Sequence, residues 1–372
     1  MTLALSVAGV FASGNHGALA RVKEWQQVGR QERNAVVLPT NQVVKPAGEQ
    51  IEFRGRPNAV KLSPDKKTAA FLNGAYKAII LIDPQTGTVK QEFDAAGSSA
   101  SFRGIAYSQD GEKLNASQAN GRVIVATVLD DGTIALDHFV ALPNSTIPYP
   151  GGEDGNPYPG GLALSDDNAT LYVVLNRNNT LGVIDLATRT VIKEIPVGNA
   201  PHDVVVNGDK AYVSNQGGRP ADPGDFTRDS SGTPIVADSE SGHAVTGTVS
   251  VVDLRAGVEV QTIEVGLQPT ALLLDGPRLF VANTNSDTVS VIDTASDVLV
   301  KTIAVEPFPG SLTGSSPSAL ALLDGKRLLV SLGRNNALAV YGLSERVFDA
   351  VQYQGTGRSR LRTTPRPLVF TA

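Results

Sequence analysis

The sequence of 372 residues contains no cysteine, one methionine, one tryptophan and four histidines. Without cysteine, a disulfide, a thiolate metal site and a cysteine nucleophile are all excluded. Aromatic residues make up only 5% of the chain, so its core must consist mainly of Val, Leu, Ile and Ala. Beyond the first 21 residues, no apolar run is long enough to cross a membrane.

Charge and motif content exclude further classes of function. The formal net charge is −5, and Lys and Arg cluster only in residues 358–366, which we interpret as a solvated terminus. A nucleic-acid-binding surface is therefore not expected. The sequence has no G-x-S-x-G, H-E-x-x-H or P-loop motif, so none of the reactions that depend on these motifs is indicated.

Glycine and proline are plentiful, at 37 and 22 residues, and they separate short apolar runs that recur. Residues 266–303 form the clearest copy, with four β-rich runs separated by Gly, Asn, Asp and Ser. This pattern predicts a four-stranded antiparallel meander. Further copies cover residues 56–93, 102–140, 156–197, 199–265 and 316–343. The Asp residues that end their third strands, Asp83, Asp185, Asp253 and Asp293, are interpreted as turn residues.

Six such repeats predict an all-β fold, because one meander cannot bury both faces whereas copies packed around an axis can. A linear solenoid is the alternative; long alternating strands and the absence of a helical period favour a closed β-propeller. We expect seven blades in a single domain, residues 34–372, with residues 34–53 and 347–372 sharing the seventh. Six blades remain an alternative, because residues 347–372 lack a P-x-x-V-x-L-S-x-D-G-like run.

The first 21 residues resemble a signal peptide. Residues 2–12 are apolar and precede the A-x-A-like sequence Ala18-Leu19-Ala20, although a basic n-region is missing. We therefore expect a periplasmic or extracellular protein.

Propeller geometry predicts that function lies on one rim, here called the top rim. It carries the starts of the innermost strands, the ends of the second strands and the mouth of the central channel. Residues 143–159 and the insertion 216–246 project there. The insertion is interpreted as a structureless loop with five carboxylates, too loosely spaced for an EF-hand.

Asparagines recur where the second strands end, at Asn73, Asn176, Asn215, Asn283 and Asn335. Asn is a natural turn residue, and this interpretation is favoured. Alternatively, amide oxygens of Asn73, Asn215 and Asn283 converge with Asp203 on Ca²⁺ or another divalent cation.

His202 and Asp203 replace the small residues found at equivalent positions of other repeats. A histidine there could serve as a general base beside Asp203, or pack against the next blade with its nitrogens satisfied. Arg103 occupies the corresponding place in the second repeat, and Arg177 and Arg334 follow rim turns. Together they would suit an anionic ligand, although solvated rim charges are the commoner case.

The sequences Tyr212-Val213-Ser214-Asn215 and Phe280-Val281-Ala282-Asn283, each followed by a V-x-V-I-D-like strand, resemble the YVTN family of bacterial β-propellers. Longer stretches, such as that beginning at Pro201-His202-Asp203, resemble the propeller portion joined to an alkaline-phosphatase-like phosphoesterase domain. The 372 residues include no such domain, so its activity implies nothing for any residue here.

These observations favour an exported, non-catalytic binding or accessory propeller, expected to be a monomer. A small-molecule or protein ligand would bind the top rim through Arg103, Asn176, Arg177, Asn215, Asn283 and Arg334. The alternative is a divalent-metal-dependent hydrolase of esters, lactones or phosphoesters, in which His202 and Asp203 handle protons. An adhesion module is a third hypothesis.

Overall fold

The computed structural model describes residues 28–31, 35–37, 39, 43–44, 51–74, 76–95, 100–148, 155–305, 314–335, 337–343 and 352–355. The chain divides into two compact units, Met1–Lys45 and Pro46–Ala372. The described part of the first unit is an antiparallel sheet of β1 (Gly29–Gln31), β2 (Ala35–Val37) and β3 (Val43–Val44). The expected leader, residues 1–21, lies outside the described residues.

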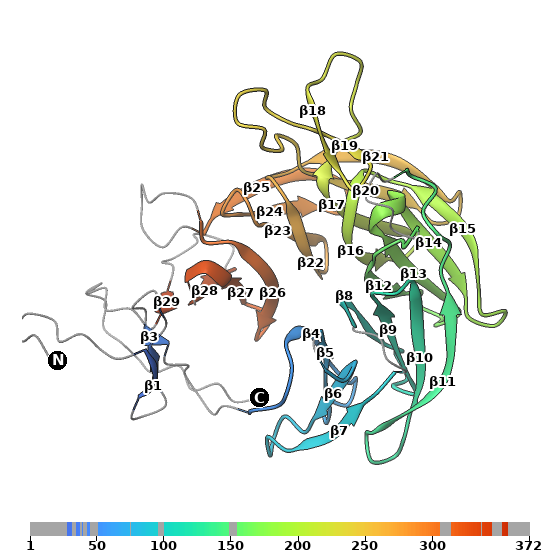
Figure 1. Cartoon of the computed structure of the whole chain (residues 1–372), viewed down its shortest axis with the longest axis vertical. Coiled ribbons are helices and arrows are strands. Elements are labelled where there is room, and N and C mark those ends of the chain that lie inside the picture. The colour runs from blue at the N-terminus through green and yellow to red at the C-terminus, as the bar shows by residue number, and fades with distance from the viewer. Residues whose placement is uncertain are drawn as a thin grey trace, which may run out of the picture. The chain divides into compact units, whose positions relative to one another are not determined.

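The second unit contains six four-stranded antiparallel sheets, each made from one predicted repeat (Figure 1). Blade 1 consists of β4 (Pro57–Leu62), β5 (Ala69–Asn73), β6 (Ile79–Ile82) and β7 (Val89–Phe93). Blade 2 consists of β8 (Ala100–Tyr107), β9 (Lys113–Gln118), β10 (Arg122–Val128) and β11 (Ile134–Ala141). Blade 3 consists of β12 (Pro159–Leu164), β13 (Thr170–Leu175), the 3-10 helix η1 (Asn176–Asn178), β14 (Thr180–Asp185) and β15 (Thr190–Pro196).

The remaining blades follow the same order from the inside outward. Blade 4 consists of β16 (Asn199–Asn207), β17 (Lys210–Gly218), β20 (Thr248–Asp253) and β21 (Val258–Glu264). Between β17 and β20 the chain forms a separate hairpin of β18 (Thr227–Ser230) and β19 (Thr233–Val236). Blade 5 consists of β22 (Pro269–Asp275), β23 (Arg278–Asn283), β24 (Thr288–Asp293) and β25 (Val298–Ala304). Blade 6 consists of β26 (Pro317–Leu323), β27 (Arg327–Leu332), η2 (Gly333–Asn335), β28 (Ala337–Gly342) and β29 (Gln352–Gly355).

The hydrophobic core lies between the blades. The described residues form five buried apolar clusters, and each joins two consecutive blades. Val, Leu, Ile and Ala predominate, as the scarcity of aromatic residues predicts, and the fully buried Tyr212 and Phe280 are the largest exceptions. Burying both faces of each central strand in this way provides most of the driving force for folding.

Turns between the outer strands use the aspartates that end the third strands. Asp83 accepts hydrogen bonds from the N–H groups of Thr86 and Gln85, and Asp253 accepts them from Arg255 and Ala256. The same kind of bond, from Thr86, is the main reason that the pKa of Asp83 is lowered. The interpretation of these aspartates as turn residues is confirmed.

The six blades follow one another along an arc, with β4 and β26 as the innermost strands at its two ends (Figure 1). The described strands do not form the expected composite blade, because β1, β2 and β3 pair with one another whereas β29 pairs with β28. The six-blade alternative is the one that the structure supports.

Candidate functional site

The innermost strand of every blade contains a β-bulge near its start. The register shifts occur, for example, between Pro159 and Leu162 in β12 and between Pro269 and Leu272 in β22. The other four innermost strands shift at the same place. A bulge bends a strand and redirects its side chains. The equivalent residues at these bulges are Asn58, Arg103, Gly160, His202, Thr270 and Ser318.

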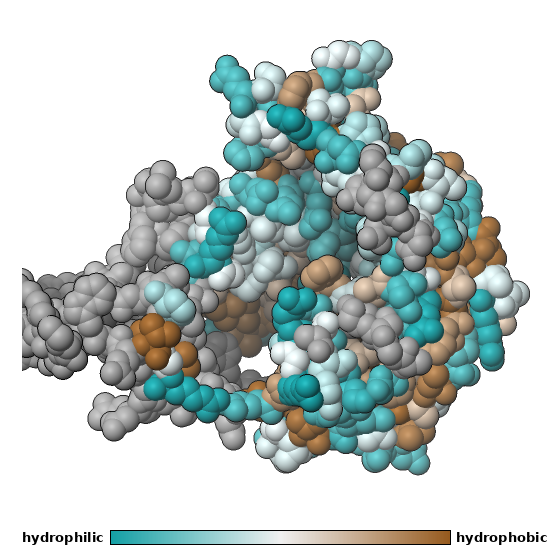
Figure 2. All heavy atoms as spheres, in the orientation of Figure 1, coloured by the Kyte–Doolittle hydropathy of each residue, from teal (hydrophilic) through white to brown (hydrophobic). Residues whose placement is uncertain are grey.

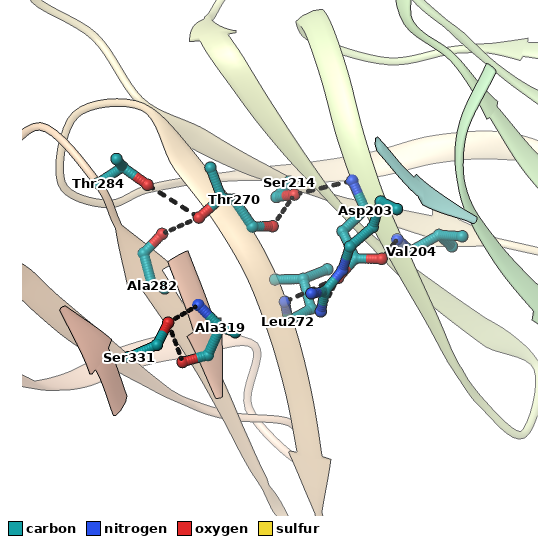
Figure 3. A network of polar contacts seen from close by, with 10 residues as sticks. Asp203, Val204, Ser214, Thr270, Leu272, Ala282, Thr284, Ala319 and Ser331 are labelled. Carbon is teal, nitrogen blue, oxygen red and sulfur yellow. Dashed lines mark hydrogen bonds and ion pairs between the residues drawn. The ribbon is translucent and has the colours of Figure 1, made fainter. Parts of the chain in front are cut away.

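Arg103 and Asp203 form an ion pair between blades 2 and 4, in which the carboxylate is buried and the guanidinium is half-buried. Nε and Nη2 of Arg103 lie 2.9 and 2.8 Å from Oδ2 of Asp203, whose side chain is only 8% exposed. The same oxygen accepts the N–H of Leu272 at 3.0 Å, and Oδ1 accepts the N–H of Val204 at 3.0 Å (Figure 3). A single carboxylate therefore connects three blades, and both of its oxygens are engaged.

Two glycines in blade 3 make room for this pair. A Cβ atom on Gly161 would lie 2.4 Å from Oδ1 of Asp203, and one on Gly160 would lie 2.6 Å from the carbonyl oxygen of His202. The His-Asp pair of blade 4 thus requires the Gly-Gly pair of blade 3, because side chains on these glycines would collide with it. Packing alone explains why both pairs differ from the other repeats.

His202 is half-buried at the same level. Burial lowers its pKa to about 4; the charge of Arg103 acts in the same direction, whereas Asp203 opposes it. The imidazole is therefore neutral at pH 7 and can donate one hydrogen bond and accept another. This is a ring suited to polar recognition rather than to electrostatic attraction of an anion.

The rim asparagines hold turns within their blades or join neighbouring blades. Asn73 accepts the N–H of Arg56 at 2.6 Å and donates to the carbonyl of Arg54 at 2.9 Å. Asn215 donates to Thr248 and Ser250, and Asn283 repeats this pattern with Thr288 and Ser290. Asn176 donates to the carbonyl of Pro201 in blade 4 at 2.8 Å. The Oδ1 atoms of Asn215, Asn283 and Asn335 are buried and have no hydrogen-bond partner among the described residues.

The residues predicted to hold a cation are distributed over three blades. Asn73 lies in blade 1, Asn215 and Asp203 in blade 4, and Asn283 in blade 5. Within the described ranges, no group of three or more His, Asp or Glu side chains is placed to hold a metal ion. The donor atoms that the structure does bring together, around Asp203, belong to an arginine and to backbone N–H groups.

The three rim arginines occupy different environments. Arg103 pairs with Asp203, as described above. Arg177 is 3% exposed in η1 and donates to the carbonyl of Ile147 at 3.2 Å. Arg334 is exposed in η2 of blade 6. They belong to blades 2, 3 and 6, and their joint binding of an anion stays a prediction.

The insertion after Asn215 is folded, contrary to the expectation of a structureless loop. β18 and β19 pair over four residues each and are joined by Ser231 and Gly232, with φ angles of 52° and 91°. Two consecutive residues with positive φ are typical of a type I′ hairpin turn. The Ser-Gly pair between two β-compatible runs was the sequence signal that could have predicted it.

The hairpin is attached to blades 3 and 4 by polar contacts. Asn199, which is 5% exposed, donates to the carbonyls of Arg219 and Pro234, and Asn179 donates to Thr233 at 3.1 Å. At the hairpin turn, a Cβ on Gly232 would lie 2.0 Å from the carbonyl oxygen of Pro148. The hairpin therefore packs against the connection between blades 2 and 3.

We call this surface the blade 3–4 platform; it comprises residues 143–148, 155–158, 176–179, 199–201 and 219–245. Its non-repetitive segments are also joined to one another, since Ser145 donates to the carbonyl of Arg177. The hairpin extends outward from the arc in Figure 1, and Figure 2 shows it covered mainly by hydrophilic residues. Exposed apolar side chains on the platform are Tyr158, Phe226 and Val245, at 38%, 41% and 49%.

A hollow lies between the first turns of blades 1 and 2. It has a volume of about 370 Å³ and several carboxylates in its wall. Asp65 and Asp110 accept hydrogen bonds from the serine two residues earlier and from the backbone N–H two residues later. These carboxylates hold their own turns, so the hollow is explained by turn structure.

No family model and no curated protein matches the chain. Solved structures do. Hydrazine synthase of Kuenenia stuttgartiensis is 16% identical with a TM-score of 0.56 over 80% of both chains. The U3-55K structure is 13% identical with a TM-score of 0.57 over 81% of both chains, and the RRP9 WD40 repeats are 13% identical with a TM-score of 0.56 over 81% of this chain and 80% of theirs.

The fold is a six-bladed β-propeller. At these identities the structural similarity establishes the fold and nothing about a ligand. Among the described residues, no helix is long and apolar enough to span a bilayer.

Proposed function

We propose that the chain is a non-catalytic binding propeller that recognises a protein partner through the blade 3–4 platform. The observation that supports this is that its non-repetitive segments are held in place by hydrogen bonds. These segments are the connection between blades 2 and 3, the η1 turn and the hairpin, none of which belongs to the repeat. Ser145, Asn179 and Asn199 bind them to one another and to the blades. Loops held rigidly on a scaffold are the usual carriers of recognition.

Surface chemistry indicates a protein rather than a small molecule. Phe226 and Val245 flank the β18–β19 hairpin in the sequence and are exposed. The hairpin stands out from the blade and does not enclose a pocket. Arg219 forms ion pairs with Asp222 and Asp225 at 3.0 and 2.7 Å, so these side chains provide a polar rim near the two apolar residues. Apolar anchors within a polar rim are typical of protein interfaces.

A turn exchange within the chain tests the proposal. Asn215 pairs with Thr248 as Asn283 pairs with Thr288, so residues 216–247 can be replaced by the four-residue blade 5 turn, Thr284-Asn285-Ser286-Asp287. A photoreactive residue at Phe226 identifies the partner, and the same residue at Val300, which is 60% exposed on β25, is the control. We expect cross-links from position 226 only, and an affinity for the purified partner at least tenfold weaker in the turn-exchange variant. An unchanged affinity in a folded variant would refute the proposal.

We further propose a YVTN-type, exported protein. The support is the recurrence of Tyr212-Val213-Ser214-Asn215-like strands in blades that the structure confirms, together with the apolar segment that ends near Ala20. Mass analysis of the protein recovered from the periplasm of its host should show a chain that begins after Ala20. An intact Met1 end, or recovery only from the cytoplasm, would contradict export.

The metal-dependent hydrolase remains a prediction from the sequence. Asp203 is engaged by Arg103, and the Nδ2 groups of Asn73, Asn215 and Asn283 donate to neighbouring residues, whereas Oδ1 of Asn215 and of Asn283 has no partner among the described residues. No described contact favours this reaction over binding, so we do not propose it.

A further inference from the structure

The β18–β19 hairpin has one covered edge and one open edge. Beyond the end of β19, Ala244 pairs with Ala237, and the N–H of Val245 donates to the carbonyl of Val236 at 3.2 Å. Pro234, within β19, has no N–H to offer on that side. Among the described residues β18 pairs with β19 alone, so its outer edge has no strand beside it.

The register of the hairpin determines which backbone groups point outward from β18. Ser230 and Thr233 close the two-residue type I′ turn and are the hydrogen-bonded pair of such a hairpin. Pairs alternate along an antiparallel ladder, so Asp229 and Thr227 belong to pairs that are not hydrogen-bonded. The carbonyl of Phe226 accepts the N–H of the residue that follows β19, at 2.9 Å, which fits this alternation. The N–H and C=O groups of Thr227 and Asp229 therefore point away from β19.

The side chains along this edge form a charged face and an apolar face, because successive residues of a strand point to opposite sides. Asp229 is exposed, and among the described residues its carboxylate accepts only the N–H of Gly232, at 3.1 Å. Phe226 and Arg228 lie on the other face, with the guanidinium carbon 5.3 Å from the ring centre. The edge therefore combines unpaired backbone groups with a negative charge on one face and an exposed aromatic ring on the other.

The charges of β18 make a second copy of this chain an unfavourable occupant of the edge. Antiparallel pairing of two β18 strands centred on Arg228 or on Asp229 would place two identical charges directly opposite each other. Pairing centred on Thr227 would place Asp225 of one copy opposite Asp229 of the other. Like charges in directly opposite positions destabilise a sheet. The edge is therefore suited to a strand of different sequence.

We propose that the partner of the blade 3–4 platform contributes an extended segment that pairs antiparallel with the outer edge of β18. This inference rests on the proposed function and specifies the part of the partner that binds. Main-chain hydrogen bonds to Thr227 and Asp229 attach the segment, which is the general mode of strand addition. A Lys or Arg of the segment lies opposite Asp229, and an apolar residue on its other face contacts Phe226. The segment therefore alternates basic and apolar residues.

A synthetic peptide tests the edge without the natural partner. The probe is Val-Lys-Val-Lys-Val-Lys-Val with blocked ends, and the control peptide has N-methyl groups on its lysines, whose N–H groups would face β18. We expect the full chain to bind the probe at least tenfold more tightly than the control, measured by NMR titration. The probe should also slow hydrogen exchange of the N–H groups of Thr227 and Asp229 at least tenfold. Equal binding of the two peptides, or slower exchange at other residues only, would overturn the proposal.

Two substitutions at one position test whether the natural partner uses the edge. Thr227→Pro removes an outward N–H but no bond to β19, whereas Thr227→Val keeps this N–H and removes only the hydroxyl. For the protein that cross-links at position 226, we expect at least tenfold weaker binding by the proline variant and less than a twofold change in the valine variant. Slow exchange of the N–H of Ile235, which faces β18, shows that the hairpin is intact. Equal affinities with an intact hairpin would refute the added strand.

The outcomes separate this inference from the function on which it rests. Without any cross-link at position 226 the protein partner is refuted, whereas binding of the peptide would still show that the edge accepts a strand. A cross-linked partner that binds both variants equally would support the platform and refute the strand. Concentration-dependent dimers in sedimentation, with slow exchange of the N–H of Thr227 in the absence of peptide, would overturn the proposal in favour of a second copy.

Discussion

Leu272 in blade 5 and Leu320 in blade 6 occupy the same position of the repeat, yet Leu272 is 5% exposed whereas Leu320 is half-buried; Val60 in blade 1 is 55% exposed. Sequence does not separate these residues, because all three are aliphatic and follow a proline by three positions. Their surroundings separate them: Leu272 is enclosed in the core between blades 4 and 5, Leu320 packs only partly on the core between blades 5 and 6, and no described blade precedes Val60. Burial in this propeller is therefore set by neighbouring blades, and the energetic role of a repeat position changes along the arc.

A second difference between the middle and the ends of the arc lies in its charges. Blades 2 to 4 contain the Arg103–Asp203 pair and the hairpin, whereas the corresponding positions of β4 and β26 hold Asn58, Ala59, Ser318 and Ala319. The middle blades, whose innermost strands are packed on both sides, are also the blades whose sequences differ most from the common repeat. A buried ion pair requires such packing, because its charges lose their hydration and need every available partner.

Asp203→Ala should have the largest effect on stability. It leaves the guanidinium of Arg103 unpaired and removes the acceptor of the N–H of Leu272, so we expect a loss of about 3 kcal/mol in the free energy of unfolding. Ala319→Ser, at the equivalent position of the exposed β26, is the control and should change stability by less than about 0.5 kcal/mol. Urea unfolding measures both. Similar losses would mean that the ion pair contributes no special stability.

Truncation of the two leucines compares the regions directly. Leu272→Ala empties a buried site and should cost about 3 kcal/mol, whereas Leu320→Ala at a half-buried site should cost about 1 kcal/mol. Thermal and urea unfolding of the two variants provide the numbers. Equal costs would contradict the difference in packing.

The sequence predicts the architecture well and the site less well, for physical reasons. Alternation and turn residues are local, so the repeats, their strands and turn residues such as Asp83 and Asp253 could be identified. The Arg103–Asp203 contact joins residues 100 positions apart that occupy different positions of the repeat. The only trace of this contact in the sequence was indirect. Gly160 and Gly161, which have no side chains, lie in blade 3, the blade between the two partners. The seventh blade was expected from the usual closure of propellers, which the described strands do not form.

Acid should destabilise the middle of the arc through His202. Its pKa is about 4 in the folded state and about 6.5 when unfolded, so the unfolded chain takes up the proton first as the pH falls. The stability from its neutral form is complete above pH 6.5 and is lost between pH 6.5 and 4. Water screens part of this effect because the ring is half-buried, so we expect about 2 kcal/mol. His202→Gln should remove this component from the pH profile of unfolding, and an unchanged profile would place the acid sensitivity elsewhere.

The serine pair gives the smallest expected effect and the closest comparison. Ser214 is fully buried and bonds both to the N–H of Asp203 and to the carbonyl of Thr270 in the next blade, so Ser214→Ala should cost about 2 kcal/mol (Figure 3). Among the described residues, Ser331 bonds only within blade 6, where water can replace it, so Ser331→Ala should cost about 0.5 kcal/mol. Urea unfolding of the two variants measures the difference. Equal costs would show that the bond from Ser214 to blade 5 adds nothing to stability.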